Sequence, residues 1–95
     1  MKVIVDLAIV CTGTNTVHKT MRKVLESDVA LVPGMRMVDR IWKKEREIRD
    51  VTFNLDDSSL YLGLRDGTES CATVEGCKEM ESSYRSAGWR SAAEF

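Results

Sequence analysis

Positive side chains are concentrated in the middle of the sequence. Residues 17–49 contain nine Lys or Arg and five Asp or Glu, which gives a net charge of +4. Residues 50–95 contain four Lys or Arg and nine Asp or Glu, which gives a net charge of −5. Clustered cations displace the counterions of a phosphate backbone, and an aromatic side chain among them can stack on bases. The stretch therefore supplies candidate contacts for a nucleic acid or a partner protein: Arg36, Arg40, Trp42, Lys43 and Lys44.

Acidic residues argue against a nucleic-acid face. Asp39, Glu45 and Glu47 interleave with these cations, and the pI of the whole chain is about 5.8. A basic middle and an acidic end can also attract each other, within one molecule or between copies. An edge strand near residues 35–42 would then lie against the acidic C-terminal helix of a second copy. We expect a homodimer, or a higher even oligomer, that salt weakens if charge supplies much of the affinity.

The chain lacks recognisable catalytic chemistry. His18 is the only histidine, and the sequence identifies no nucleophile or carboxylate as its neighbour. Asp56 and Asp57 separate two apolar runs, where aspartate typically forms a turn by bonding its own backbone. Asp6 interrupts an apolar run, so it lies near a strand end, meets a donor, or is a buried functional carboxylate. We expect no cofactor and favour a role other than catalysis.

The cysteines are odd in number and match no metal-binding spacing. Cys11 lies in an apolar run, which predicts a buried thiol. If Cys71 and Cys77 lay on one helix, they would be about 240° apart around its axis, so they would share no ligand and form no bridge. We expect three free thiols, no bound metal and a cytoplasmic location.

Hydrophobic periodicity predicts a small α+β domain. Val3–Cys11 is largely apolar on both faces, which is typical of a central strand covered on both sides. Turn residues follow in Thr12–Thr16. Val17–Glu26 fits a strand slightly better than a helix, because it and the residues just before it are rich in β-branched side chains. A helix at this position is the alternative and would give the order β-α-β-β-β-α.

The next segment combines a turn signal with alternation. Pro33-Gly34 predicts a sharp turn or bulge. Residues from Met35 to Ile41 then alternate between apolar and charged side chains, which predicts a strand. Lys43–Glu47 is predicted to be a charged, exposed turn or edge.

The clearest predicted element is a hairpin around the loop Asp56–Ser59. Six apolar residues share one face when residue 55 pairs with 60, residue 53 with 62 and residue 51 with 64. Ile48 is out of phase with this face, which predicts a bulge near Arg49-Asp50. Tyr61 then points outward beside Gly63 and forms a patch suited to a partner.

Residues 73–87 are predicted to form a C-terminal helix. Ser70 or Thr73 caps its start, and Gly88 suits a left-handed C-cap after which Trp89 folds back. Its apolar stripe recurs at steps of three and four residues: Cys77, Met80, Tyr84 and Ala87. We expect one domain over residues 1–90 and a disordered tail over residues 91–95.

The sequence thus predicts a bent antiparallel sheet of four or five strands, partly barrel-like, with the C-terminal helix packed on it. No apolar run approaches the ~20 residues that a membrane span requires. Three functions are compatible with these patterns. The first is a non-catalytic interaction or self-associating module, the second a nucleic-acid-binding module, and the third a small-ligand binder or enzyme in the bend of the sheet. A deep apolar pocket with convergent polar groups would favour the third.

Overall fold

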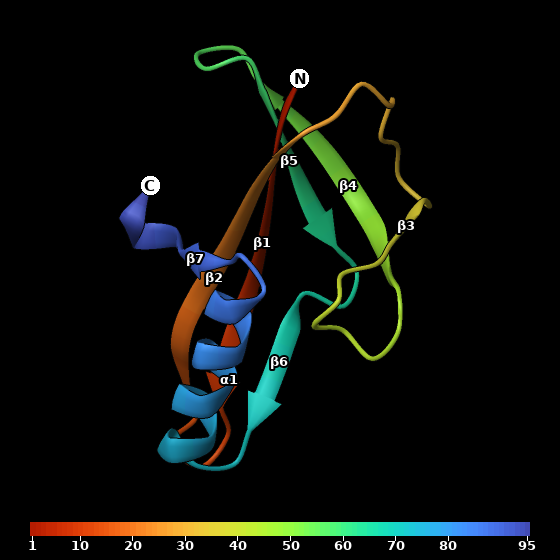
Figure 1. Ribbon diagram of the computed structural model, residues 1–95. Coiled ribbons are helices and arrows are strands. Elements are labelled where there is room, and N and C mark those ends of the chain that lie inside the picture. Colours follow the sequence, from red (N-terminus) through yellow and green to blue (C-terminus); the bar gives the residue numbers. More distant parts are fainter.

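The computed structural model describes residues 1–95 as an α+β fold with one long helix (Figure 1). Its strands are β1 (Lys2–Cys11), β2 (Thr16–Glu26), β3 (Arg36–Met37), β4 (Arg46–Asn54), β5 (Ser59–Leu64), β6 (Thr68–Cys71) and β7 (Arg90–Ser91). The helices are α1 (Val74–Ser86) and the short 3₁₀ helix η1 (Ala92–Glu94). Neither helix has the length and apolar character needed to cross a membrane.

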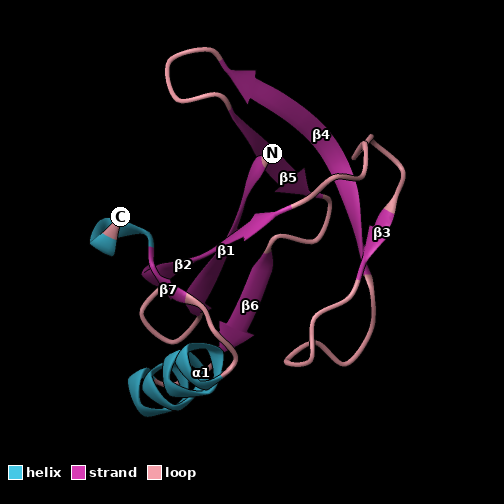
Figure 2. Ribbon diagram, turned by 45° about the horizontal axis from the view of Figure 1, so that its top comes forward, coloured by secondary structure: helices cyan, strands magenta, loops and turns pink.

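The sheet consists of two hairpins laid side by side. Its strand order is β3-β4-β5-β1-β2-β7, and β6 pairs with the second half of β1. The β1–β2 and β4–β5 pairs are antiparallel, whereas β5 and β6 both run parallel to β1. The sheet curls into a half-barrel, and α1 lies against the end of it formed by β6 and the second half of β1 (Figures 1 and 2).

The prediction of a bent sheet with a packed C-terminal helix is confirmed, but the prediction of four or five antiparallel strands is wrong. The sheet has seven strands and is mixed. β1 and β5 are the most apolar strands, so both occupy interior positions, while the charged strands β2 and β4 flank them. β5, the second strand of the β4–β5 hairpin, lies beside β1, the first strand of the β1–β2 hairpin, and these two central strands run parallel.

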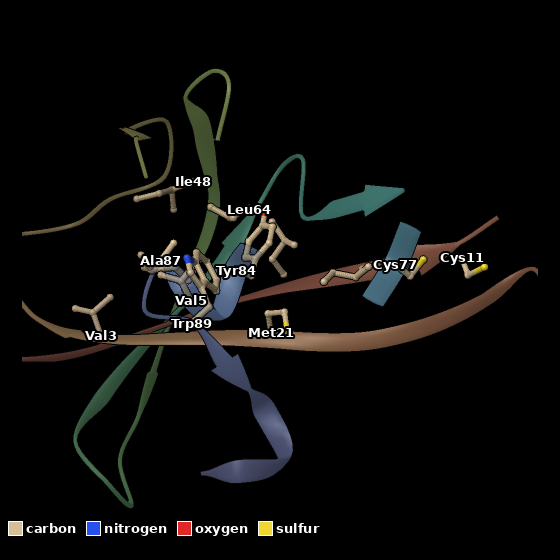
Figure 3. Close-up of a cluster of buried hydrophobic side chains, with 13 residues drawn as sticks. Val3, Val5, Cys11, Met21, Ile48, Leu64, Cys77, Tyr84, Ala87 and Trp89 are labelled. Carbon is tan, nitrogen blue, oxygen red and sulfur yellow. The ribbon is translucent and has the colours of Figure 1, made fainter. Parts of the chain in front are cut away.

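The two N-terminal strands confirm the sequence prediction, including the choice of strand over helix for β2. The inner side chains of β1 are all buried in the core: Val3, Val5, Leu7, Ile9 and Cys11. Figure 3 shows Val5 beside Tyr84 and Trp89, the two largest buried side chains, with Val3 and Cys11 toward opposite ends of the cluster. The outer face of β1 is only partly covered, and there Asp6 meets a donor because Arg22 binds it through two hydrogen bonds of 2.7 and 2.8 Å.

Residues 27–45, which we call the strap, connect the two hairpins across the open side of the half-barrel (Figure 2). Pro33-Gly34 forms the predicted turn, with Gly34 at φ 94°. The predicted strand over Met35–Ile41 is wrong in length, because only Arg36 and Met37 pair with β4. Asp39 Oδ1 accepts a hydrogen bond from the backbone N–H of Ile41, which turns the chain away from the sheet.

The β4–β5 hairpin keeps the predicted faces but not the predicted register. Val51 pairs with residue 62 and Phe53 with residue 60, a shift of two positions. Asn54 and Asp57 accept hydrogen bonds from backbone N–H groups within the loop and place the turn at residues 55–58. Leu55 therefore leaves the strand and is 83% exposed, and Phe53 is 46% exposed. The predicted bulge is confirmed by a register shift between Ile48 and residue 50.

The helix follows its predicted capping signals. Thr73 accepts a hydrogen bond from Gly76 N–H at the start of α1. Gly88 has φ 95°, and the backbone N–H of Trp89 returns to the carbonyl of Tyr84. The last residues, for which the sequence predicts a disordered tail, are described in a regular conformation: Arg90–Ser91 pairs with β2, and η1 follows.

The corrected register generates the first prediction. Because Phe53 is nearly half exposed, Phe53→Ala is expected to lower the free energy of unfolding by about 1–2 kcal/mol, below the 3–5 kcal/mol typical of a fully buried aromatic residue. Leu62→Ala in the same hairpin removes a buried side chain and is expected to cost about 2–5 kcal/mol. Urea denaturation of both variants tests the order. A larger loss for the Phe53 variant would contradict this register.

Candidate functional site

An apolar pocket of about 240 Å³ lies where the strap, the inner face of the sheet and the chain after α1 meet. Six of its eight lining residues are hydrophobic. We call it the tryptophan pocket, and its wall consists of Val5, Lys23, Leu25, Met37, Val38, Asp39, Trp42 and Trp89. Strand β1 supplies one of these side chains, β2 supplies two, the strap supplies four, and the segment after α1 supplies the last.

The two tryptophans are held by an aromatic cluster. The ring of Trp89 lies 5.9 Å from that of Trp42 and 5.3 Å from that of Tyr84, centroid to centroid, and the second pair is T-shaped. Trp42 donates its indole N–H to the Tyr84 hydroxyl at 3.0 Å, and that hydroxyl donates to Glu69 at 2.8 Å. Burial, together with the Glu69 carboxylate, raises the pKa of Tyr84, so this hydroxyl stays protonated.

Arg46 of β4 contacts both Trp42 of this aromatic cluster and Glu69. Its guanidinium donates to the carbonyls of Asp66 and Thr68 at 2.6 and 3.2 Å and lies 3.1 Å from a Glu69 carboxylate oxygen. It also lies 5.0 Å from the ring centre of Trp42. The sequence predicted Lys43–Glu47 to be exposed, and this is wrong for Arg46, whose side chain is only 9% exposed. The alternation of side chains along a strand could have indicated this burial, because Arg46 lies two residues before the buried Ile48 and shares its inward face of β4.

The polar part of the pocket is an ion pair. Lys23 donates to Asp39 at 2.7 Å and to the carbonyl of Ala87 at 2.9 Å. Burial raises the pKa of Asp39, but the hydrogen bonds from Lys23 and from the N–H of Ile41 outweigh it, so the pKa lies below its usual value. The indole N–H of Trp89 lies near the Asp39 carboxylate and also favours its ionised form. However, this N–H makes no hydrogen bond of good geometry, and it is the one buried side-chain polar atom without a hydrogen-bond partner.

The residues that the sequence proposes as partner or nucleic-acid contacts lie in three different places in the structure. Trp42 faces inward and is half-buried in the pocket, whereas Arg36, Arg40, Lys43 and Lys44 are exposed on the strap. Arg36 pairs with Glu45 at 2.7 Å, and Arg40 donates to the carbonyl of Ser86. Tyr61 lies elsewhere, on the outer face of the sheet, with Arg22 over its ring.

The acid–base candidates are engaged in structural contacts. His18 lies 3.0 Å from Glu81, a partner that the sequence could not identify, and Lys19 and Arg85 contact the same carboxylate. Asp57 bonds the backbone and hydroxyl of Ser59 within the hairpin turn. No group of three or more His, Cys, Asp or Glu side chains is arranged to hold a metal ion.

The three cysteines converge. The separation expected for Cys71 and Cys77 on a common helix does not apply, because Cys71 ends β6 and only Cys77 lies on α1. Cys11 and Cys71 pair across neighbouring strands, and the Cys77 thiol lies 3.9 Å from the carbonyl of Cys71. Figure 3 shows Cys77 and Cys11 at one end of the core. All three are free thiols.

Comparison of the chain with protein-family models, with curated proteins and with solved structures finds no match.

The ion pair in the pocket predicts a pH-dependent effect. Asp39→Asn leaves Lys23 without its partner and is expected to lower the free energy of unfolding at pH 7 by about 1–3 kcal/mol. Because the pKa of Asp39 is lower in the folded protein than its usual value of 3.8, its ionised form stabilises the fold at pH values above 3.8. This contribution is lost as the pH falls through the folded-state pKa of Asp39. The loss should therefore shrink in acid. Urea denaturation at pH 7 and in acid measures it, with the exposed Asp56→Asn as control, and an equal loss at both pH values would exclude the ion-pair explanation.

The thiols are expected to react in a defined order. Burial, together with the neighbouring thiols of Cys11 and Cys71, raises the pKa of Cys77 to about 11. Cys71 is the only thiol that is not fully buried. Iodoacetamide should therefore modify Cys71 first and Cys77 last in the folded protein, as followed by peptide mass spectrometry. Simultaneous modification of all three would mean that this end of the core opens readily.

Proposed function

We propose that this chain is a small, non-catalytic binding module whose tryptophan pocket takes a compact, uncharged and mainly apolar ligand. The observation that carries the proposal is the pocket itself, with two indole rings and four aliphatic or thioether side chains around one ion pair. Ligand sites are typically concave and apolar, with few polar groups to orient the ligand. A cavity of about 150 Å³ lined by apolar side chains accepts benzene, so about 240 Å³ suits a single ring with a small substituent.

The charge of the ligand follows from the ion pair. Lys23 and Asp39 neutralise each other, so the pocket offers no net charge to a ligand. Burying an unpaired charge is costly, whereas an apolar ring replaces water against the tryptophan walls. A neutral ligand with one polar atom can still bond the rim, and an acceptor that reached the Trp89 N–H would give that group its missing partner.

Two observations weigh against the nucleic-acid alternative. Trp42, the aromatic residue expected to stack on bases, is turned inward and bonded to Tyr84. Several cations of the basic stretch are already paired within the chain, Arg46 with Glu69, Lys23 with Asp39 and Arg36 with Glu45. Fewer free cations remain to displace the counterions of a phosphate backbone.

A matched set of three ring compounds tests the proposal. Benzyl alcohol, benzoate and benzylammonium share a ring but differ in charge. We expect benzyl alcohol to bind with a Kd of roughly millimolar or tighter, and both charged analogues to bind at least about tenfold more weakly. Chemical shifts of the two indole N–H groups in ¹⁵N-labelled protein report the binding.

A variant pair locates the binding site. Val38 lines the pocket and is 79% exposed, so Val38→Phe is expected to occlude the pocket without disturbing the core. Val29→Phe changes a strap residue of 63% exposure outside the pocket and is the control. Loss of binding in the Val38 variant alone supports the pocket. Absence of binding by all three compounds, or equal binding to both variants, would contradict the proposed function.

A further inference from the structure

One edge of the sheet is left unpaired for several residues. β4 pairs with β5 along one side from Ile48 to Asn54. On its other side, β3 and the strap cover only the first three residues, where Ile48 exchanges backbone hydrogen bonds with Gly34 and Met35. Residues 49–54 have no strand beside them on that side.

The backbone groups that face this open edge can be identified. The carbonyl of Glu47 accepts from Arg65 N–H of the hairpin, so the next residue, Ile48, directs its groups away from β5. Residues 49 and 50 form the bulge opposite Gly63, after which antiparallel pairs alternate between bonded and non-bonded. Val51 and Phe53 therefore point their N–H and C=O groups into the open edge, whereas Thr52 bonds to β5.

The open segment lacks the features that usually protect an edge. Charged residues, proline or a covering element discourage pairing with another chain. Here the charged pair Arg49 and Asp50 bonds to itself at the bulge, 2.9 Å apart, and residues 51–54 contain neither charge nor proline. Valine, threonine and phenylalanine favour strands, and Phe53 exposes nearly half of its surface.

We infer that this edge pairs with the same edge of a second copy, joining two half-barrels into one continuous antiparallel sheet across a two-fold axis at Thr52. This register places Val51 opposite Phe53 of the other copy, twice, so each pair exchanges backbone hydrogen bonds. It sets a β-branched residue against an aromatic ring on the inner face, which stabilises cross-strand pairs. Asp50 faces Asn54, so no like charges meet. The contact is isologous, as two-fold symmetry requires.

The choice of a second copy rests on this self-complementarity. An edge that binds a foreign peptide needs only free backbone groups. Here the side chains also match under the two-fold operation, and the hydrogen-bonded pairs of Val51 with Phe53 lie between the bulge and the turn. The dimer lies on uncharged residues, so its affinity should change little with salt, unlike the charge-driven dimer that the sequence predicted.

Hydrogen exchange tests the edge with an internal control. In a dimer, the amides of Val51 and Phe53 become protected as protein concentration rises, while the Thr52 amide is protected at every concentration. Analytical ultracentrifugation of the full chain should show a dimer at micromolar concentration in low and high salt. A monomer throughout would overturn the inference. Protection of Val51 and Phe53 only after addition of an unrelated strand-forming peptide would assign the edge to a foreign partner and overturn it equally.

Two substitution pairs fix the register. Thr52→Lys places like charges on the axis and should weaken dimerisation at least about tenfold, whereas the β-branched Thr52→Val should not. Thr52→Cys should form an intermolecular disulfide with oxidised glutathione, because side chains of a non-bonded antiparallel pair lie about 4.5–5.5 Å apart at Cβ. Asn54→Cys lies off the axis and should not. Cross-linking at residue 54 but not 52, or a dimer indifferent to Thr52→Lys, would overturn the proposed interface.

Discussion

The position of the strap depends on the buried charge of Arg46. The strap spans residues 27–45, but its backbone bonds to β4 only over residues 34–37, so side chains must hold the rest of it. Arg46 begins β4 at the end of the strap and lies under the ring of Trp42. It also binds the carbonyls at the break between β5 and β6, and it pairs with Glu69. One side chain thus connects the strap, the sheet break and, through Glu69 and Tyr84, the helix.

A buried guanidinium is tolerated only when its hydrogen-bonding capacity is filled. Here the carbonyls of residues 66 and 68 and the Glu69 carboxylate supply partners from β6 and the break before it, and the ring of Trp42 supplies one from the strap. Because the Arg46 guanidinium must meet all of these partners at the same time, the strap is restricted to a narrower range of positions than apolar contacts alone would allow. Because four of the eight residues lining the tryptophan pocket belong to the strap, the shape of the pocket follows from this constraint.

The sequence predicted the elements whose signals are local. β1, the bulge and the helix follow from apolar spacing, the helix caps follow from Thr73 and Gly88, and β2 follows from its β-branched residues. Features that depend on several segments were missed or misplaced. The hairpin register slipped by two positions because a shift of two preserves the faces of both strands, so the apolar pattern does not distinguish the alternatives. The turn residues Asn54 and Asp57 carry the information that decides between them.

Charge and context explain the remaining errors. Arg46 stands in a run of charged residues, which normally indicates a solvated surface, and its acceptors come from residues 66–69, twenty or more positions later. The separation expected between Cys71 and Cys77 applies only to two residues on one helix, whereas Cys71 completes β6 before Thr73 caps α1. The tryptophan pocket has no sequence signature, because its wall combines side chains from positions 5 to 89. Only the return of Trp89 onto the helix end was foreseen among its parts.

The bulge at Arg49 links the closed and open halves of β4. Before it, Ile48 faces the core and gives its backbone groups to the strap. Without the extra residue, Val51 and Phe53 would turn their side chains to the outer face, and the inner surface of the hairpin would carry Asp50 and Thr52 instead. With it, the apolar side chains stay on the inner face, and their backbone groups point to the edge that the strap leaves uncovered. The same irregularity therefore preserves the core and creates an edge suited to pairing with another strand.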